Sequence, residues 1–405
     1  MKKMLIAAST AMLLAGCSGG HGKHTEAQLN VAKERMNQIK SATEWDMARQ
    51  AFLSGDLKKA LTKVDLSLAL NESVPKSHVL RGRILIEQGF LENAMDSFLR
   101  AEALDQQNVE AQYYLGIIFE RFSEREKALA RYERAAELDP ANAQYVIAAA
   151  EMLIDLDRIG EAERYLSSRS TLFQHNAGVR HALGHIATLE GRHVEAVRMY
   201  NEARLLAPDD MSILEDLIRA QVATRQYAAA EYNLNRILSV EDYQTRRDLQ
   251  HARARCLMRL DRPVEAREIL LALTADDAGA TDVHAWVDLG NVAYVLKDLN
   301  RVRAASSRAI ALAPARHEGY LLRALWERRR GNLEGALTYM NEAATRRGDD
   351  VQVLMLQGLV QHEMHDYRNA AVTFAKALRQ QPKNSLLQRL VFDTGRRLEA
   401  EYGTD

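Results

Sequence analysis

The chain has 405 residues, a formal net charge of −1 at pH 7 and 27% charged residues, with the two signs mixed along its length. This distribution excludes a basic nucleic-acid-binding stripe and a strongly acidic disordered tail. Two cysteines, Cys17 and Cys256, are too few for a disulfide-stabilised scaffold. Length alone would suggest two or three globular domains, but an internal repeat gives a better description.

Residues 1–16 have the character of an export signal. They begin with the basic pair Lys2 and Lys3 and continue as an apolar run that is too short to span a bilayer as a mature helix. The string Leu14-Ala15-Gly16-Cys17 resembles the lipobox of bacterial lipoproteins, in which cleavage precedes the cysteine and the thiol receives a diacylglyceryl group. We therefore expect a signal peptide over residues 1–16 and a lipidated Cys17. The alternative is an ordinary signal peptide with a chance cysteine.

The residue after the cysteine bears on localisation. The sorting rule of bacterial lipoproteins retains a protein in the inner membrane when aspartate follows the lipidated cysteine. Ser18 follows Cys17 here, so the resemblance implies the outer membrane, facing the periplasm, with the inner membrane as the alternative. Two or more acyl chains would anchor the chain stably.

Two short segments lie between the cysteine and the repeats. Residues 17–24 are rich in Gly and polar side chains, which predicts a flexible tether. Residues 25–40 place Leu29, Ala32, Met36 and Ile39 at helical spacing. We expect these residues to form a capping helix that shields the end of the array.

One pattern recurs about every 34 residues over residues 41–384, most clearly in 109–142. Its ten copies begin at residues 41, 75, 109, 143, 177, 211, 247, 283, 317 and 351. Position 8 is mostly small: Ala48, Gly82, Gly116, Ala150, Gly184, Ile218, Ala254, Gly290, Ala324 and Gly358. Position 20 is alanine in every copy except the one with Val302, and position 24 is mostly large, as in Phe98, Tyr132, Tyr200 and Phe374. Small residues let two helices approach closely and large ones fill the space left.

This period and this pattern resemble the tetratricopeptide repeat (TPR). The resemblance implies an all-α solenoid of about ten helix-turn-helix repeats, wound as a right-handed superhelix with a concave groove. Pro140, Pro208, Pro314 and Pro382 share position 32, where a proline ends the second helix. Residues 385–405 have the pattern of a closing, solvating helix, with Leu386, Leu387, Leu390, Val391 and Leu398 on one face.

Departures from the pattern predict weak points in the array. Arg169 replaces a small residue, and we expect an irregular or mobile joint over residues 166–176. A second such joint is expected over residues 274–282, which have the composition of a longer loop. Ser306 replaces the large residue of position 24 in the copy that begins at residue 283.

The sequence contains no motif that predicts catalysis. A Walker loop, GxSxG and CxxC are missing, and the string His362-Glu363-Met364-His365-Asp366 has aspartate where a zinc protease needs its second histidine. His181 and His185 are one helical turn apart, but no third ligand stands at matching spacing. We expect no enzyme activity, no metal, no other cofactor and no small-molecule substrate, and we expect Cys256 to be a buried small hydrophobe.

The TPR resemblance assigns the inward face of each first helix to positions 2, 5, 6, 9, 12 and 13. Aromatic, arginine and histidine residues at these positions suit recognition of a protein segment. The lysine/asparagine carboxylate clamp of chaperone-binding members is missing at positions 5 and 9, so chaperone C-terminal tails are not expected partners. The candidate partner-binding residues are Trp45, Arg49, Arg83, Tyr113, Ile117, His181, His185 and Arg255.

These features together predict a lipid-anchored, periplasm-facing adaptor or scaffold that binds other proteins and no nucleic acid. Lipobox-bearing TPR proteins resemble the pilotin and assembly lipoproteins of type IV and Flp/Tad pili, which accompany an outer-membrane secretin. Two alternatives stay open. One is a scaffold for exopolysaccharide export or cell-wall enzymes, and the other is an adaptor for envelope proteases.

Overall fold

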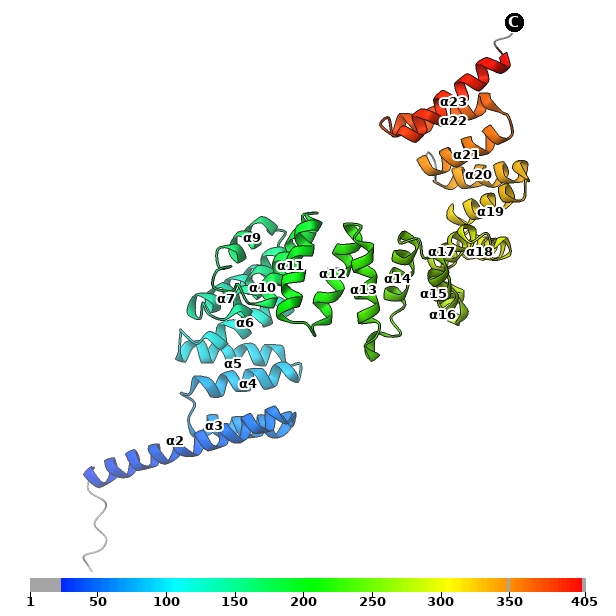
Figure 1. Cartoon of the computed structure of the whole chain (residues 1–405). Coiled ribbons are helices and arrows are strands. Elements are labelled where there is room, and N and C mark those ends of the chain that lie inside the picture. Colours follow the sequence, from blue (N-terminus) through cyan, green and yellow to red (C-terminus); the bar gives the residue numbers. More distant parts are fainter. Residues whose placement is uncertain (1–22, 348–349, 403–405) are drawn as a thin grey trace, which may run out of the picture. The chain divides into compact units, whose positions relative to one another are not determined.

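The structure, a computed structural model, describes residues 23–347 and 350–402. Within them it consists of α-helices and one 3-10 helix and contains no strand, which confirms the all-α prediction (Figure 1). Cys17, the signal segment and residues 17–22 of the expected tether lie outside the described residues, and Lys23 and His24 already belong to the first helix. In the described part of the chain, no helix combines the length and apolar character that crossing a membrane requires.

The chain divides into two compact units, and α11 (His193–Leu206) is split between them after Tyr200. The other helices of unit 1 are α2 (Lys23–Leu53), α3 (Leu57–Leu70), α4 (Pro75–Glu87), α5 (Leu91–Leu104), α6 (Val109–Arg121), α7 (Arg125–Leu138), α8 (Ala143–Asp155), α9 (Ile159–Ser167) and α10 (Ala177–Leu189). Unit 2 begins with α12 (Met211–Ala223), α13 (Tyr227–Ile237), the 3-10 helix η1 (Glu241–Tyr243), α14 (Arg247–Arg259), α15 (Pro263–Ala275) and α16 (Asp277–Ala280). It ends with α17 (Val283–Val295), α18 (Leu299–Leu312), α19 (Glu318–Arg329), α20 (Leu333–Arg347), α21 (Val351–Glu363), α22 (Tyr367–Gln380) and α23 (Ser385–Tyr402).

The first helices start where the last residue of the preceding copy can cap them. In most copies that residue is Asn or Asp, and its side chain accepts a hydrogen bond from a backbone N–H of the first helical turn, which satisfies a donor that the helix itself cannot. Helices α4, α14 and α19 follow Val74, Arg246 and His317 instead and have no such side-chain bond. The capping residues are Asn108, Asn142, Asn176, Asp210, Asp282, Asp350 and Asn384. Most first helices are therefore thirteen residues long and coincide with positions 1–13 of the repeat.

The turn within each hairpin also repeats. Position 15 of all ten copies has a positive φ angle, with glycine at Gly55, Gly89, Gly191 and Gly331 and other residues in the remaining six. The backbone N–H of the following residue donates to the carbonyl of position 11, as Glu124 does to Phe119 at 2.8 Å. This is the Schellman arrangement that ends a helix in a left-handed residue.

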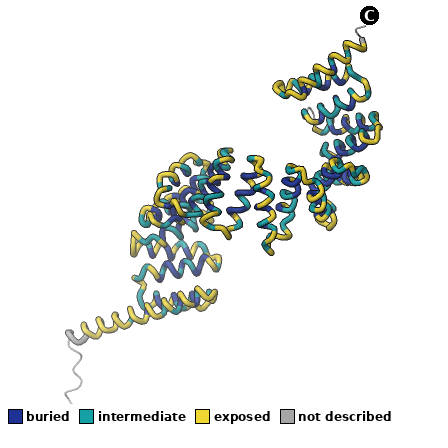
Figure 2. Tube along the Cα trace, in the orientation of Figure 1, coloured by how far each residue is buried: buried dark blue, intermediate teal, exposed yellow. Residues whose placement is uncertain are grey.

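The two helices of a hairpin meet at positions 8 and 24. Gly82 faces Phe98, Gly116 faces Tyr132 and Gly358 faces Phe374, so that a Cβ atom on any of these glycines would lie 2.5 or 2.6 Å from the aromatic ring. Hairpins with an aliphatic position 24 carry alanine at position 8 instead, as Ala150 does with Leu166, except for one hairpin that pairs Ile218 with Leu234. Every position-20 residue from Ala60 to Ala370 is fully buried. The core therefore runs as a line of buried contacts along the hairpins of each unit (Figure 2).

Ser306 shows how one hairpin compensates for a missing large residue. Ser306 is fully buried, and the space above Gly290 is occupied from the next hairpin, where a Cβ atom on Gly290 would lie 2.6 Å from Leu322 Cδ1. Leu322 is itself buried. The departure that the sequence marked as a weak point is thus filled by a neighbouring first helix.

The two expected joints are irregular but filled. Helix α9 ends early at Ser167, and Phe173 returns from the following turns into the core, where it is 6% exposed. Arg169 turns its guanidinium over the Tyr165 ring, 3.9 Å from its centroid. The irregularity at Arg169 was correctly expected, but the segment contributes a core residue.

The expectation of a longer loop over residues 274–282 is wrong. Helix α15 continues to Ala275, and Asp276 caps the short helix α16 by accepting from Gly279 N at 2.7 Å. Arg247 binds the Asp276 carboxylate and the Leu273 carbonyl, and Trp286 Nε1 donates to the Gly279 carbonyl at 3.1 Å. Side chains distant in sequence thus hold this segment in a helical turn.

The prediction of a separate capping helix over residues 25–40 is also wrong. Residues 23–53 form the single helix α2, whose C-terminal part belongs to the first hairpin and buries Ala48 and Ala51. Residues 27–40 instead remain exposed over nearly their whole length and do not shield the array (Figure 2). At the other end, α23 buries Leu387 against α22 but leaves Leu386 52% exposed.

We predict that Gly116→Ala lowers the free energy of unfolding by about 1–3 kcal/mol, because its Cβ would overlap the buried Tyr132 ring. Adding Tyr132→Leu to Gly116→Ala reproduces the Ala150/Leu166 pairing of the neighbouring hairpin and should recover part of the loss. Gly395→Ala is the control, because no atom lies within 4 Å of the position of its Cβ. Urea denaturation followed by circular dichroism measures all four proteins. Equal stability of Gly116→Ala and wild type would contradict the contact.

Candidate partner-binding sites

The first candidate site lies in unit 1, on the first helices of the first three hairpins. We call it the aromatic row and define it as Trp45, Phe52, Tyr113 and Tyr114 with the cations Arg49, Lys76 and Arg83. At its start, Trp45 Nε1 donates to the Lys76 carbonyl at 3.2 Å, and the Lys76 ammonium lies 4.1 Å from the centre of the Trp45 ring. The Arg49 guanidinium lies 5.8 Å from the same ring. The start of the row therefore combines an exposed positive charge with a half-buried indole.

Arg83 joins the start of the aromatic row to its end. Its guanidinium lies 5.1 Å from the Phe52 ring of α2 and 5.4 Å from the Tyr114 ring of α6. Tyr114 in turn stacks on Phe98 of α5, with ring centroids 5.2 Å apart and planes 9° apart. Cation–π contacts of this kind fix the guanidinium without neutralising it, so Arg83 keeps its charge for a ligand.

Tyr113 sits at the centre of a tyrosine cluster on α6, α7 and α8. Its ring centroid is 5.4 Å from Tyr114, 5.6 Å from Tyr132 and 5.0 Å from Tyr145. The Tyr113 hydroxyl accepts a hydrogen bond from Gln144 Nε2 at 2.6 Å. Burial raises the pKa of Tyr113, despite the opposing hydrogen bond from Gln144, so the hydroxyl stays protonated at neutral pH. Ile117 packs against this cluster as a partly buried side chain.

The two predicted histidines lie apart from the aromatic row. Both are on α10, where His185 is exposed and His181 is half-buried. Over residues 23–347 and 350–402, no group of three or more His, Cys, Asp or Glu side chains could hold a metal ion.

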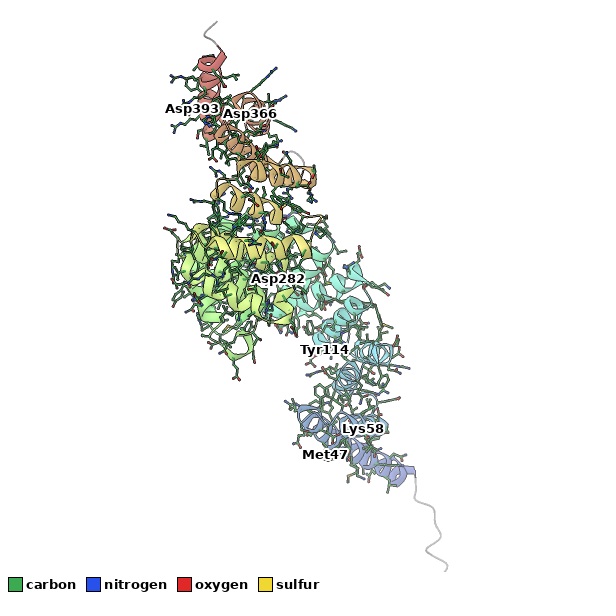
Figure 3. All side chains as sticks on the ribbon, turned by 90° about the vertical axis from the view of Figure 1, so that its right-hand side faces the viewer. Met47, Lys58, Tyr114, Asp282, Asp366 and Asp393 are labelled. Atoms are coloured by element: carbon green, nitrogen blue, oxygen red, sulfur yellow. The ribbon has the colours of Figure 1, made fainter. Side chains whose placement is uncertain are left out.

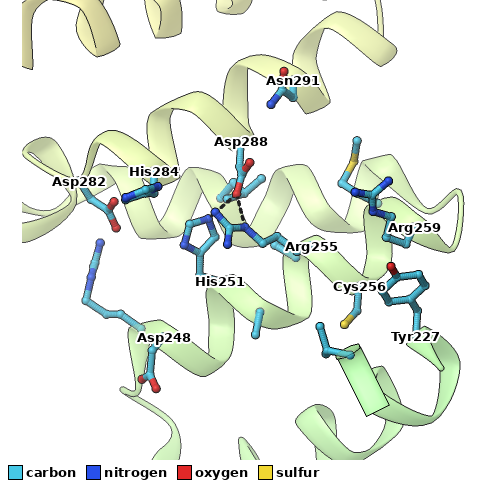
Figure 4. A pocket seen from close by; sticks show the side chains of 16 residues that line it. Tyr227, Asp248, His251, Arg255, Cys256, Arg259, Asp282, His284, Asp288 and Asn291 are labelled. Carbon is cyan, nitrogen blue, oxygen red and sulfur yellow. Dashed lines mark hydrogen bonds and ion pairs between the residues drawn. The ribbon is translucent and has the colours of Figure 1, made fainter. Parts of the chain in front are cut away.

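The second candidate site is a pocket of ≈ 910 Å³ in unit 2 (Figure 4). Its walls come mainly from the first helices of two adjacent hairpins, α14 and α17, with Val222 and Tyr227 from the preceding hairpin. The polar lining includes His251, Arg255 and Arg259 from α14 and Asp288 and Asn291 from α17.

Asp288 is the centre of the pocket's hydrogen bonding. Its Oδ2 atom accepts from Arg255 Nε at 2.6 Å and lies 2.7 Å from His251 Nε2 (Figure 4). Burial opposes ionisation of this carboxyl, but the hydrogen bonds from His251 and Arg255 outweigh it and hold the pKa of Asp288 below its usual value. Asp288 therefore ties two neighbouring first helices together as a carboxylate.

Two arginines of α14 lie beside Asp288, in a lining that also holds Arg247, Asp248 and Asp282. Arg255 uses only its Nε for Asp288 and is exposed, and Arg259, one turn further along α14, is exposed without a hydrogen-bond or ion-pair partner among the residues that the structure describes. Cys256 also borders the pocket but is only 2% exposed, and burial raises the pKa of its thiol to about 11. The expectation that Cys256 is a buried side chain is confirmed. The pocket can offer guanidinium groups to carbonyl or carboxylate oxygens of a bound segment.

The structure thus separates the eight predicted residues into three groups. Trp45, Arg49, Arg83, Tyr113 and Ile117 lie on or against the aromatic row, His181 and His185 lie on α10, and Arg255 lies in the pocket of unit 2. Sequence reasoning missed Asp288. The repeat alignment could have identified it, because Asp288 occupies position 6 of its copy and His251 and Arg255 occupy positions 5 and 9 of the preceding copy.

We predict that Asp288→Asn lowers the free energy of unfolding at pH 7 by about 1–3 kcal/mol, because two charge-assisted hydrogen bonds lose their acceptor charge. The lowered pKa means that this stabilisation is present above the pKa of an unfolded aspartate and is lost as the pH falls through the folded value. The difference in free energy of unfolding between Asp288→Asn and wild type should therefore decrease at acidic pH. Urea titrations at neutral and acidic pH measure it.

The control for this prediction is Asp393→Asn, an exposed site in the same unit (Figure 3). It removes the same charge and should change stability little. If Asp288→Asn and Asp393→Asn have equal effects at pH 7, the three-residue interaction does not stabilise unit 2.

Comparison with known proteins agrees with the repeat architecture. A family profile described as "TPR repeat" matches residues 82–121. Similar curated proteins include DnaJ homolog subfamily C member 3 of Rattus norvegicus, 24% identical over 245 residues that cover 55% of this chain and 49% of that protein. DnaJ homolog subfamily C member 7 of Homo sapiens is 28% identical over 174 residues, covering 40% of this chain and 35% of that protein. The chain spans about half or less of the length of these relatives.

Similar solved structures are likewise partial matches. The TPR protein YrrB, described as having an unusual peptide-binding site, is 20% identical and covers 42% of this chain and 89% of its own, with a TM-score of 0.36. The pilF structure of Pseudomonas aeruginosa is 14% identical and covers 51% of this chain and 94% of its own, with a TM-score of 0.45. The helical hairpins, the repeated turns and the family profile together establish that this chain has an all-α tetratricopeptide-repeat fold.

Proposed function

We propose that this protein is a non-catalytic adaptor that binds segments of other proteins on the first-helix faces of its repeats. The aromatic row supports this function, because half-buried rings and cations lie side by side on successive first helices. Partly exposed aromatic and arginine side chains supply most of the binding energy in protein interfaces. Rings already fixed by stacking lose little side-chain entropy on binding.

The chemistry of the aromatic row favours an extended or helical segment that brings backbone carbonyls or carboxylates. Arg83 is held between two rings and Arg49 and Lys76 are exposed, so the row offers three positive charges within one face. The pocket beside Asp288 adds Arg255 and Arg259 in unit 2.

We further propose that the protein is anchored by lipid at Cys17, in the outer membrane and facing the periplasm. The support is the string Leu14-Ala15-Gly16-Cys17 after an apolar run, followed by Ser18. An anchor confines the repeats to the membrane surface. It raises the effective concentration of any membrane-bound partner, so that modest affinity suffices.

Within this class, the partner we propose is a secretin or another component of pilus assembly. The alternatives are a scaffold for exopolysaccharide export or cell-wall enzymes, and an adaptor for envelope proteases. The genes adjacent to this one discriminate among them, since secretin and pilin genes, glycan synthase genes or protease genes would each point to one pathway.

We predict that Arg49→Glu with Lys76→Glu abolishes capture of the partner from envelope extracts, because two exposed charges of the aromatic row are reversed. The control is Lys58→Glu with Lys59→Glu, a double reversal on exposed positions of the second helix α3 (Figure 3). Circular dichroism checks that both variants fold. Capture is measured by affinity purification and mass spectrometry. Loss of capture in the control alone would place binding on the second-helix side, and capture by both variants would count against the aromatic row.

We predict that Cys17→Ser removes acylation and changes the fractionation of the protein, because the serine hydroxyl cannot receive the thioether-linked lipid. Mass spectrometry of the N-terminal peptide and membrane fractionation measure the two effects. A lipid that remains on the Cys17→Ser protein, or a wild-type peptide without lipid, would show that the anchor proposal is wrong.

A further inference from the structure

Within the part of unit 1 that the structure describes, the N-terminal half of α2 packs against no other helix. Residues 27–40 are exposed throughout, apart from the half-buried Asn37, whereas Ser41, the next residue, is already buried (Figures 1 and 2). Ser41 marks the point where α2 meets α3, since its Oγ donates to the Ser67 carbonyl at 2.9 Å. Thus about four turns of helix project beyond the first hairpin.

This projecting segment carries a continuous apolar stripe. Leu29, Met36 and Ile39 are 60%, 51% and 64% exposed, with Ala32 between them, and Val31, 47% exposed, lies off this stripe. Their spacing of three and four residues places all four on one face of the helix. Three large apolar side chains on one unpartnered face are costly to leave in water, which indicates that another surface covers them.

Basic side chains border the stripe on both sides. At 100° of rotation per residue, Lys33 and Lys40 fall next to Leu29 on one edge and Arg35 falls next to Ile39 on the other. The acidic Glu34 lies on the opposite face of the helix. Long basic side chains beside an apolar face can lay their methylene stems on it and extend their charges sideways to anionic groups.

This charge arrangement disfavours a second copy of the chain as the covering surface. A spacing of three and four residues would suit a two-stranded coiled coil with Leu29 and Met36 at a positions and Ile39 at a d position. In the parallel form, Arg35 of one helix would face Lys40 of the other, which places like charges together at the flanks. Flanks that are basic on both edges instead complement an anionic surface.

The sequence before α2 points to a lipid surface. The chain outside the structure contains an apolar run that ends at Gly16 and Cys17, only six residues before Lys23. Six residues span at most about 20 Å. The anchor proposed at Cys17 would therefore keep the start of α2 close to the lipid headgroups.

We propose that residues 27–40 of α2 lie along an anionic lipid surface, with Leu29, Met36 and Ile39 in the interfacial region and Lys33, Arg35 and Lys40 among the phosphates. The proposal rests on the proposed function for the proximity of the membrane, but the stripe itself is independent of the anchor chemistry. Amphipathic helices of this kind bind interfaces through combined apolar burial and attraction to anionic lipids. Because α2 continues into the first hairpin, such contact would orient the repeats at the surface as well as tether them.

The test places an environment-sensitive fluorescent amino acid at position 36 or, as the matched control, at position 34 of the full chain. Each protein is mixed with vesicles of phosphatidylglycerol and phosphatidylethanolamine, or of phosphatidylcholine alone, with brominated acyl chains as quenchers. We expect a blue shift and severalfold stronger quenching at position 36 than at position 34 on the anionic vesicles, and a smaller difference on the neutral ones. Equal quenching at both positions would overturn the proposal.

Two double variants test whether the basic side chains beside the stripe are needed for the fluorescence shift. Lys33→Glu with Lys40→Glu should abolish the shift at position 36, whereas Lys58→Glu with Lys59→Glu should leave it unchanged. A blue shift that grows with protein concentration without vesicles would show that a second copy covers the stripe, and it would overturn the proposal. If mass spectrometry finds the N-terminal peptide without lipid, that result overturns only the proposed anchor at Cys17. The proposed contact of α2 with lipid is still tested, because quenching at positions 36 and 34 is compared on added vesicles.

Discussion

The contact between position 8 and position 24 is the interaction on which each hairpin depends. A glycine in the first helix leaves a space one side chain deep, and an aromatic ring of the second helix fills it, as at Gly116 and Tyr132. All four aromatic residues at position 24 share their hairpin with a glycine at position 8, whereas the aliphatic ones are paired with alanine or, in one copy, with isoleucine. The two columns therefore vary together, because the sum of the two side-chain volumes must fill one interhelical space. Ser306 is the exception that supports this constraint, since Leu322 supplies the missing volume from the next hairpin.

The same constraint positions the candidate binding sites. Because position 8 faces the second helix in every hairpin, neighbouring positions of the first helix present equivalent faces from one repeat to the next. Trp45, Arg83 and Tyr113 lie in sequence copies 41, 75 and 109 and form one row for this reason. In unit 2, His251 and Arg255 of one copy reach Asp288 of the following copy by the same geometry. The side chains on these faces thus change from copy to copy without changing the fold.

Sequence reasoning predicted the helical hairpins well because three columns of residue size constrain them at a fixed period. It missed features that depend on a position shared between copies or on side chains from outside the segment. Six of the ten left-handed turn residues are not glycine, so only their shared position 15 could have shown them. The short helix α16 depends on Arg247 and Trp286, which contact it from outside the segment. The break expected at residue 41 was wrong because helix periodicity continues through it, and among residues 23–347 and 350–402 no side chain buries Leu29 or Ile39.

The claim that partners bind the first-helix faces is tested most directly by a photocrosslinking scan in living cells. A photoreactive amino acid is placed singly at position 9 of the first three copies, replacing Arg49, Arg83 or Ile117. Matched proteins carry it at the exposed position 18 of the same copies, replacing Lys58, Glu92 or Glu126. The account predicts crosslinks to one envelope protein from the position-9 series and none from the position-18 series. Equal crosslinking from both series, or crosslinking from position 18 alone, would contradict it.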